Sequence, residues 1–302
     1  MHGLDGEDVT VVVMDSGLGG LLVAADLAER MAELRSWRTA RVVYFNCRPS
    51  ATQGFDTMET QDRRRRVFDN ALAWAAGACA PQAIVIACNS LSAIYDLTPF
   101  ARQPRAAVMG IMDIGVEEIL AALGRWPGGQ VILAATTTTA QSGEYERRLA
   151  ARGVAQGAFF CHDCPGVAGV IERDGRGAES RAKIERFMSV AARRAAADRP
   201  VILSLNCTHF SYAPELFVEG LAKAGVEVKE TLDPTVKMAE RFLAGAPRGR
   251  FDRTDVSVEV ISQAPLAEAQ KRSIGALIEP RSARTAAALW RGRCEAGLFD
   301  IT

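Results

Sequence analysis

Short apolar runs alternate with stretches of helical periodicity along most of this chain, and that alternation is the strongest constraint on its fold. The first run, residues 9–14, is rich in valine, and from Leu21 to Leu34 apolar residues recur at helical spacing. Strands that are apolar on both faces are typical of parallel sheets covered by helices, so we predict an α/β fold. The predicted strands cover residues 9–14, 41–45, 83–87, 107–111, 130–134, 157–160, 201–205 and 226–230.

The pattern changes after residue 245. Residues 245–253 are rich in glycine, proline and arginine and are interpreted as a connector. A further strand is predicted over residues 256–262, followed by a helical region. No short tandem repeat and no low-complexity segment is found.

Four residues whose side chains could take part in catalysis or ligand binding come directly after predicted strands, namely Asp15, Cys88, Thr136 and Cys207. Parallel α/β sheets bind their ligands at the carboxyl ends of the strands. We therefore expect these four residues to line one shared crevice.

Composition favours a small-molecule ligand. The 302 residues are 48% hydrophobic, which is enough for a substantial core. Lysine plus arginine and aspartate plus glutamate number 36 each, so no overall field attracts nucleic acid or an anionic membrane. The basic run from Arg63 to Arg66 is flanked by Asp62 and Asp69, and is interpreted as a solvated helix face or a subunit contact.

The hydropathy pattern does not suggest a membrane protein. The longest apolar stretch, residues 71–88, is interrupted by Pro81, so we expect no membrane span. The acidic first residues have neither the basic start nor the apolar core of a secretory signal. We expect a cytoplasmic protein.

The seven cysteines are an odd number and do not suggest a disulfide framework. Cys161 and Cys164 have CxxC spacing, but no second Cys/His pair lies nearby, so two partly buried thiols at a strand-to-helix turn are preferred over a metal site. We expect no metal. Cys47, Cys79 and Cys294 are interpreted as small buried apolar residues.

Cys88 and Cys207 are different, because both end a strand-length apolar run and both have Asn and Ser or Thr neighbours. Each is expected to precede a helix whose N-terminal amides favour a thiolate. Such a pair suits acid and base work from two sides of one substrate. His209 is either a structural group or a residue that sets the protonation of the Cys207 thiol, and we favour the second interpretation.

Two turns are candidate ligand holders. The turn from Asp15 to Gly20 matches neither phosphate-binding glycine motif, and its carboxylate suits an ammonium group or a proton-transfer partner. A purely structural turn is the alternative. The row from Thr136 to Thr139 predicts a cup for a carboxylate, although helix capping explains one or two of these hydroxyls.

Taken in order, these motifs resemble the aspartate/glutamate racemase superfamily, and within it the glutamate racemases most closely. The similarity runs from about residue 9 to about residue 245. The segments that carry it are Asp-Ser-Gly-Leu-Gly-Gly from Asp15, Ala-Cys-Asn-Ser around Cys88, Ala-Thr-x-x-Thr-x-x-Ser-Gly-x-Tyr from Ala135 to Tyr145, Cys164-Pro165 followed by Glu172, and Cys-Thr-His from Cys207.

The resemblance implies two pseudosymmetric α/β lobes, each a mainly parallel sheet flanked by helices, with the active site in the cleft between them. The lobes are expected at 1–105 plus about 213–302, and at about 106–212. The resemblance also implies an isomerase with no cofactor that forms a D-amino acid of the kind used in peptidoglycan, and it leaves room for a homodimer.

Carried over by motif, Cys88 and Cys207 would be the two bases, assisted by Asp15 and His209, with Glu172 a weaker assistant. The substrate-binding residues implied by the resemblance are Ser16, Gln53, Gly54, Asn89, Ser90, Thr136, Thr139 and Thr208. Glutamate is the first-guess substrate.

The sequence departs from the glutamate racemase pattern at the loop that shapes the side-chain pocket. Thr52-Gln53-Gly54 replaces Pro-Tyr-Gly, and Asn46-Cys47-Arg48-Pro49 replaces Gly-Asp-Thr. An aspartate or hydantoin racemase, a maleate isomerase relative and a non-catalytic binding protein therefore stay as alternatives.

Overall fold

The computed structural model describes residues 4–302, and these fall into two compact units. The first unit comprises the described residues up to Ile111 together with Thr235–Thr302, and the second comprises Met112–Pro234. Each unit is an α/β body built on a parallel sheet, so the predicted fold class is confirmed.

The sheet of the first unit has six parallel strands in the order β10-β9-β2-β1-β3-β4. Its strands are β1 (Asp8–Asp15), β2 (Thr39–Asn46), β3 (Ala83–Ile86), β4 (Ala107–Gly110), β9 (Asp255–Ser262) and β10 (Arg293–Cys294). Its α-helices are α1 (Leu21–Leu34), α2 (Gln61–Cys79), α3 (Asn89–Ile94), α4 (Pro99–Arg102), α11 (Pro234–Phe242), α12 (Glu268–Ile278) and α13 (Ala283–Trp290). Short 3₁₀ turns lie at η1 (Phe55–Thr57) and η2 (Tyr95–Leu97).

The sheet of the second unit has four parallel strands in the order β6-β5-β7-β8. These are β5 (Gln130–Ala135), β6 (Phe159–Asp163), β7 (Val201–Asn206) and β8 (Val228–Leu232). Its helices are α5 (Ile111–Arg125), α6 (Thr137–Ser142), α7 (Glu144–Ala151), α8 (Val167–Asp174), α9 (Ala178–Ala192) and α10 (Pro214–Lys223), with 3₁₀ turns at η3 (Gln156–Ala158) and η4 (Phe210–Tyr212). The order β6-β5-β7-β8 repeats the order β2-β1-β3-β4 of the first unit.

The expected boundaries of the second lobe, about 106 and 212, differ from those of the structure. Strand β4 pairs with β3, Ala83 against Ala107, so the first unit continues to Ile111. At the other end β8 pairs with β7, Val201 against Val228. Because that pairing completes the second sheet, the chain returns to the first unit only at Thr235.

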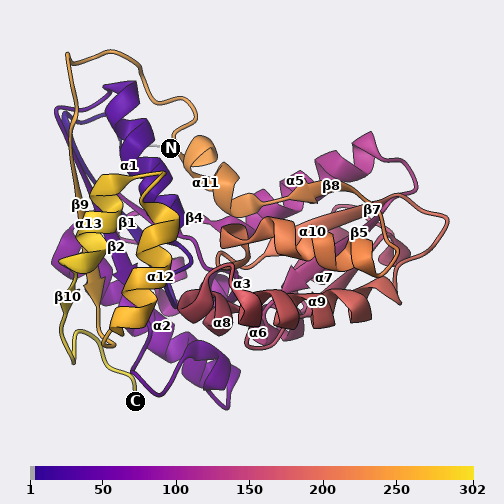
Figure 1. The fold of residues 1–302 in the computed structure, drawn as a ribbon. Helices are drawn as coiled ribbons and strands as arrows, with labels where there is room; N and C mark the ends of the chain where they lie inside the picture. The colour runs from indigo at the N-terminus through magenta and orange to yellow at the C-terminus, as the bar shows by residue number, and fades with distance from the viewer. Residues whose placement is uncertain (1–3) are drawn as a thin grey trace. The chain divides into compact units, whose positions relative to one another are not determined.

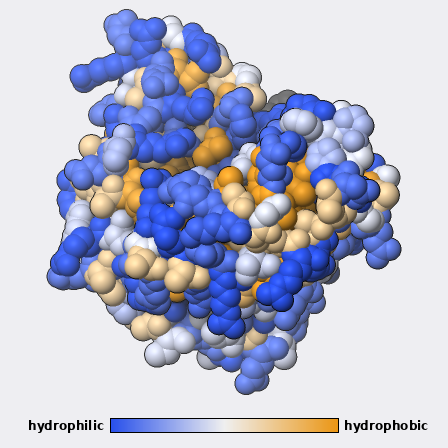
Figure 2. All heavy atoms as spheres, turned by 45° about the vertical axis from the view of Figure 1, so that its right-hand side comes forward, coloured by the Kyte–Doolittle hydropathy of each residue, from blue (hydrophilic) through white to orange (hydrophobic). Residues whose placement is uncertain are grey.

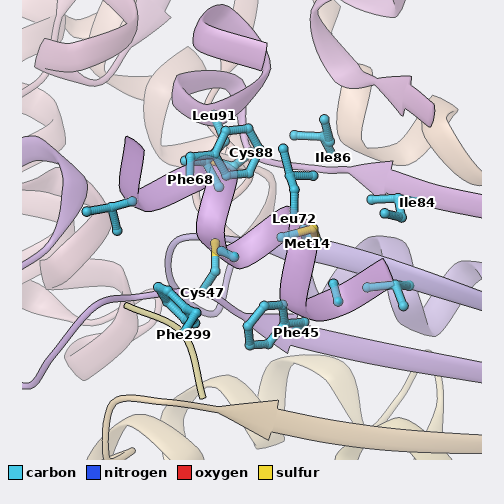
Figure 3. Packing of buried hydrophobic residues seen from close by; sticks show 14 of the residues in the cluster. Met14, Phe45, Cys47, Phe68, Leu72, Ile84, Ile86, Cys88, Leu91 and Phe299 are labelled. Carbon is cyan, nitrogen blue, oxygen red and sulfur yellow. The ribbon is translucent and has the colours of Figure 1, made fainter. Parts of the chain in front are cut away.

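The core of the first unit joins the strands to α2. Met14, Phe45 and Ile86, from three neighbouring strands, are completely or almost completely buried with Phe68 and Leu72 of α2 (Figure 3). Burying side chains of this size stabilises a fold by about 1.5–3 kcal/mol each. The valine-rich strands are thus covered by apolar helix faces, as the alternating pattern predicts.

The segment after residue 245 completes the first unit. Strand β9 pairs with β2 along its whole length, from Thr39 against Asp255 to Asn46 against Ser262. Figure 1 shows the yellow helices α12 and α13 lying near α1, and Ser282 donates a hydrogen bond of 2.6 Å to Glu29 of α1. This segment is therefore part of the sheet and its covering layer.

Hydrophilic residues predominate on the face drawn in Figure 2, with hydrophobic residues in smaller areas among them. Within residues 4–302, no helix has the length and apolar character needed to cross a membrane.

Candidate active site

Strand register brings the predicted residues of the first unit to one edge of its sheet. Strand β1 ends at Asp15, whose neighbour on β2 is Asn46. On the other side Met14 pairs with Ile86, two residues before Cys88. The carboxyl ends of three adjacent strands therefore carry an acid, an amide and a thiol.

Cys88 contacts Ser16 in this unit. The Cys88 Sγ lies 3.2 Å from the Ser16 Oγ, and the thiol is 7% exposed. Cys88 is the N-cap of α3, as predicted, and Asn89 and Ser90 form the buried first turn of that helix. The amides at a helix start stabilise a thiolate, and a neighbouring hydroxyl can donate a hydrogen bond to it. A buried thiol in this position can therefore give up a proton and take it back.

The turn that starts at Asp15 is held from β2. The Asp15 Oδ1 accepts a bond of 3.1 Å from the Gly17 amide, and the Tyr44 hydroxyl donates to the Gly17 carbonyl at 2.5 Å. The Cys47 thiol donates to the Asp15 carbonyl at 3.2 Å. A Cβ at Gly20 would lie 2.7 Å from the Asp15 Oδ2, so the close approach of α1 requires glycine.

Tyr44 and Cys47 were not predicted to support the site. Burial raises the pKa of Cys47 well above its usual range, and the nearby Cys88 and Asp15 add to that effect. Its neutral thiol suits a donor to a carbonyl. The order of strands would have been needed to find either residue, because only the β1–β2 pairing brings them beside Asp15.

Gln53 and Gly54 lie in the loop between β2 and η1. The Gln53 Oε1 accepts a bond of 3.3 Å from Arg63, and the Gly54 amide donates to Thr57 at 3.1 Å. Within residues 4–302, no hydrogen bond joins Gln53 or Gly54 to Cys88. Their predicted role in binding substrate stays a prediction.

The second unit contains a buried chain of three titratable groups. The Cys207 Sγ lies 3.8 Å from the His209 Nδ1, and the His209 Nε2 lies 2.7 Å from the Glu172 Oε1. The side chains of His209 and Glu172 are 8% and 6% exposed. Glu172 comes from α8 and the other two follow β7, so this contact joins segments about 35 residues apart.

Burial disfavours the charged form of His209, but the contacts of its ring with Cys207 and Glu172 outweigh this effect. Hydrogen bonds to Cys207 and Glu172, together with their negative charges, raise the pKa of His209 well above its usual range. A protonated imidazole can donate from Nε2 to Glu172 and from Nδ1 to a sulfur anion. The arrangement can therefore support a thiolate as a base.

The helix expected directly after Cys207 is absent from the structure. Residues 210–212 form only the 3₁₀ turn η4, and the next α-helix starts at Pro214. The expectation was wrong because the Phe210 amide bonds to the Cys207 carbonyl in a tight turn. His209 and Glu172, rather than helix amides, provide the polar surroundings of this thiol.

The row from Thr136 to Thr139 is partly engaged in the fold itself. Thr136 caps α6 by accepting from the Thr139 amide, and its hydroxyl lies 3.2 Å from that of Thr139. The Thr137 hydroxyl donates to Asp163 at 2.9 Å. Thr208 is buried beside Cys207. The turn follows β5, next to β7, so Thr136 and Cys207 end neighbouring strands.

Cys161 lies within β6 and is half-buried, whereas Cys164 is buried in the turn between β6 and α8, so only Cys164 lies at the predicted strand-to-helix turn. Burial raises the pKa of Cys161 to about 12 and that of Cys164 further still. In the part of the chain that the structure describes, no group of three His, Cys, Asp or Glu residues could hold a metal ion.

Comparisons with known proteins agree with these motifs. A family model described as Asp/Glu/Hydantoin racemase matches residues 24–239. A glutamate racemase of Pseudomonas paraeruginosa is 28% identical over 240 residues, which cover 79% of this chain and 83% of the relative.

Two solved structures share the fold. The glutamate racemase of Francisella tularensis in complex with D-glutamate aligns with a TM-score of 0.68 at 17% identity, covering 90% of this chain and 94% of its own. A glutamate racemase of Bacillus anthracis aligns with a TM-score of 0.65 at 19% identity, covering 95% and 96%.

Proposed function

Since the chain belongs to the Asp/Glu/hydantoin racemase family, we propose that it is a cofactor-independent amino-acid racemase with Cys88 and Cys207 as its two bases. Glutamate is the proposed substrate, because the curated relative at 28% identity is a glutamate racemase. A structural neighbour was solved with D-glutamate bound, which supports the same choice.

The observation that carries the proposal is the buried contact of Cys207 with His209 and Glu172. A protonated His209 stabilises a sulfur anion, so Cys207 starts as the base. Cys88, bonded to the neutral hydroxyl of Ser16, starts as the acid. Enzymes that pair an acid with a base need groups whose surroundings differ in this way.

In the proposed reaction the Cys207 thiolate removes the α-proton, and the C–H electron pair moves into the α-carboxylate to give an enediolate-like anion. The Cys88 thiol then gives its proton to the opposite face of the α-carbon. The products are the other enantiomer, a Cys207 thiol and a Cys88 thiolate, which is the starting state for the reverse direction. The reaction requires both sulfurs to reach one α-carbon.

The remaining predicted residues have supporting roles in this proposal. Asp15 assists Cys88, as His209 and Glu172 assist Cys207. Asn89, Ser90, Thr136, Thr139 and Thr208 hold the amino and carboxylate groups, and their dipoles stabilise the developing charge. Ser16, Gln53 and Gly54 contact the side chain. A cytoplasmic location and a homodimer stay predictions.

The proposal is tested with Cys88→Ala and Cys207→Ala. Each variant should lose racemisation of glutamate by roughly 100-fold to 10,000-fold, measured by circular dichroism and by deuterium uptake at Cα in D₂O. Cys79→Ala is the control, since Cys79 is a buried thiol of α2. Full activity in either variant would refute the two-base mechanism.

The substrate is tested on the wild-type protein with a panel that includes glutamate, aspartate and hydantoins. Exchange with aspartate or a hydantoin but not glutamate would move the protein to another activity of the family. Absence of exchange across the whole panel would favour the non-catalytic binding protein.

A further inference from the structure

Two contacts join the end of α8 to the segment that follows β7. In the buried contact, the His209 Nε2 lies 2.7 Å from the Glu172 Oε1. In the other, the Arg176 Nε donates to the Tyr212 carbonyl at 2.7 Å. Arg176 comes four residues after Glu172, and Tyr212 comes three residues after His209. The two contacts are therefore neighbouring ties between the same two segments.

The connector that carries Arg176 is bonded at both ends. Where α8 ends, the Gly175 amide donates to the Ile171 carbonyl at 2.9 Å. Gly175 has a φ of 58°, in the left-handed region that favours glycine. The Asp174 Oδ2 accepts a bond of 2.9 Å from the Ser180 amide in the first turn of α9. Because these bonds tie the connector to two helices, Arg176 leaves the backbone at a defined place.

The segment that receives the Arg176 bond also carries His209. The 3₁₀ turn η4 begins directly after His209, and the Tyr212 amide donates to the His209 carbonyl at 3.1 Å. A shift of Tyr212 relative to α8 would therefore move the backbone of His209 as well. A donor that holds the Tyr212 carbonyl next to α8 thus also fixes how far the imidazole lies from Glu172.

The carbonyl bond, rather than the adjacent ion pair, is able to fix this turn. The Arg176 Nε also lies 3.1 Å from the Glu215 Oε1, but the two side chains are 55% and 42% exposed. Ion pairs between exposed side chains contribute little to stability. The bond to Tyr212 is charge-assisted, and its acceptor belongs to the backbone and has no rotamer freedom.

The position of Arg176 and its charge act on His209 in opposite directions. Two titratable groups that face His209, Glu172 of α8 and Cys207 at the end of β7, raise its pKa. Cys164 interacts electrostatically with Cys207 but stays neutral, because burial raises its pKa. The positive charge of Arg176 alone would lower the pKa of His209. Holding Glu172 close to the imidazole raises it, so an experiment can separate the two effects.

We infer that Arg176 is a positioning residue, which holds the Glu172 carboxylate against the His209 imidazole through its bond to the Tyr212 carbonyl. No motif of the sequence indicated this role. Its kinetic consequence rests on the proposed racemase function, since it requires Cys207 to act as a base. The contact between Glu172 and His209 itself does not depend on that reaction.

The test replaces Arg176 in three ways. Arg176→Met removes both the donor and the charge. Arg176→Gln removes the charge but keeps an N–H donor bonded to Cδ, where the arginine has its Nε. Arg176→Lys keeps the charge but has a carbon atom in place of Nε. Arg181→Met is the matched control, because Arg181 is 46% exposed on α9 and pairs with Glu219 of the neighbouring α10 (Figure 1).

The decisive readout is the titration of His209, followed by NMR in protein labelled at its histidines. The chain has three histidines, so the His209 signal is identified by its loss in His209→Gln. We expect Arg176→Met and Arg176→Lys to move the titration midpoint to lower pH. Arg176→Gln should restore most of the wild-type midpoint, and Arg181→Met should leave it unchanged. If Arg176→Met fails to fold, as judged by thermal melting, Arg176→Lys against Arg176→Gln decides the question.

Two outcomes of the titration would overturn the inference. One is a midpoint that moves to higher pH in Arg176→Met and Arg176→Gln but not in Arg176→Lys, which would show an effect of charge alone. The other is an unchanged midpoint in all three variants. In a Glu172→Gln background, Arg176→Met should cause no further shift, because the carboxylate to be held is absent. A full additional shift there would also contradict the inference.

Kinetics separate this inference from the proposed reaction. Arg176→Met should lower kcat/KM for glutamate by about 2-fold to 10-fold, the usual contribution of one hydrogen bond. The basic limb of its pH–rate profile should move to lower pH together with the titration. A protein that racemises nothing but shows the expected midpoints would refute the racemase and keep the role of Arg176. Racemisation of glutamate with an unchanged midpoint in Arg176→Met would refute the role of Arg176 alone.

Discussion

The two candidate cysteines occupy matching places in the two sheets but have unlike neighbours. Cys88 follows β3 and Cys207 follows β7, and these strands hold the same position in the orders β2-β1-β3-β4 and β6-β5-β7-β8. Cys88 contacts the neutral hydroxyl of Ser16, whereas Cys207 contacts His209, which in turn contacts Glu172. Topology thus determines where each thiol lies, and a few side chains determine which polar groups surround it.

The difference should be visible in kinetics even though the two enantiomers have equal free energies. That equality forces kcat/KM to be the same in both directions. The separate values of kcat and KM are not constrained in this way. A variant that alters the surroundings of only one of the two thiols should therefore change kcat unequally in the two directions, while kcat/KM falls equally in both.

The largest effect is expected from His209→Gln, which removes the cation beside Cys207. Racemisation should fall by roughly 100-fold or more, the usual contribution of a positioned proton-transfer group, measured as kcat/KM with each enantiomer. His162→Gln serves as the control, because His162 is a buried histidine of β6 in the same unit. Equal losses in both variants would indicate a packing defect rather than a role in proton transfer.

A smaller effect is expected from Glu172→Gln, which keeps the side-chain shape but removes the charge. The pKa of His209 should fall, since Glu172 is one of the groups that raise it. The basic limb of the pH–rate profile should then move to lower pH. Activity measured above that limb should drop about 10-fold for each pH unit by which the limb moves.

The raised pKa of His209 also predicts how the free energy of unfolding depends on pH. His209 has a raised pKa in the folded protein, so its stabilising contribution is complete below the pKa of the unfolded chain and disappears as the pH rises through the folded value. The wild type should exceed Glu172→Gln in free energy of unfolding most clearly at acidic pH. Glu179→Gln, at an exposed ion pair with Arg173, is the control. A pH profile unchanged by Glu172→Gln would contradict the three-residue chain.

The smallest effect is expected from Ser16→Ala, because one neutral hydrogen bond contributes only about 0.5–1.5 kcal/mol. A loss of about 2-fold to 10-fold is predicted, with kcat changed more in the direction in which Cys88 donates the proton. Ser189→Ala, at an exposed serine of α9, should leave activity unchanged. A loss as large as that of His209→Gln would mean that the neighbours of Cys88 and Cys207 contribute equally to proton transfer.

Local signals predicted most of the secondary structure. The valine-rich run before Asp15 and the apolar run before Cys207 became β1 and β7, because both are of strand length, contain β-branched residues and are bounded by turn residues. The turn after Cys207 was predicted less well, since one hydrogen bond from Phe210 chose a 3₁₀ turn over an α-helix. Boundaries of the second unit depended on β8, whose pairing with β7 no local pattern encodes.

The sequence by itself determined the alternating α/β layout and the thiols, acid and histidine at the strand ends, because apolar periodicity and motif spacing are local properties. Tertiary structure decided the partners of those groups. Glu172 reaches His209, and Tyr44 and Cys47 hold the turn at Asp15. Such contacts depend on strand order and helix packing, and these are set by the burial of the whole chain rather than by any one segment.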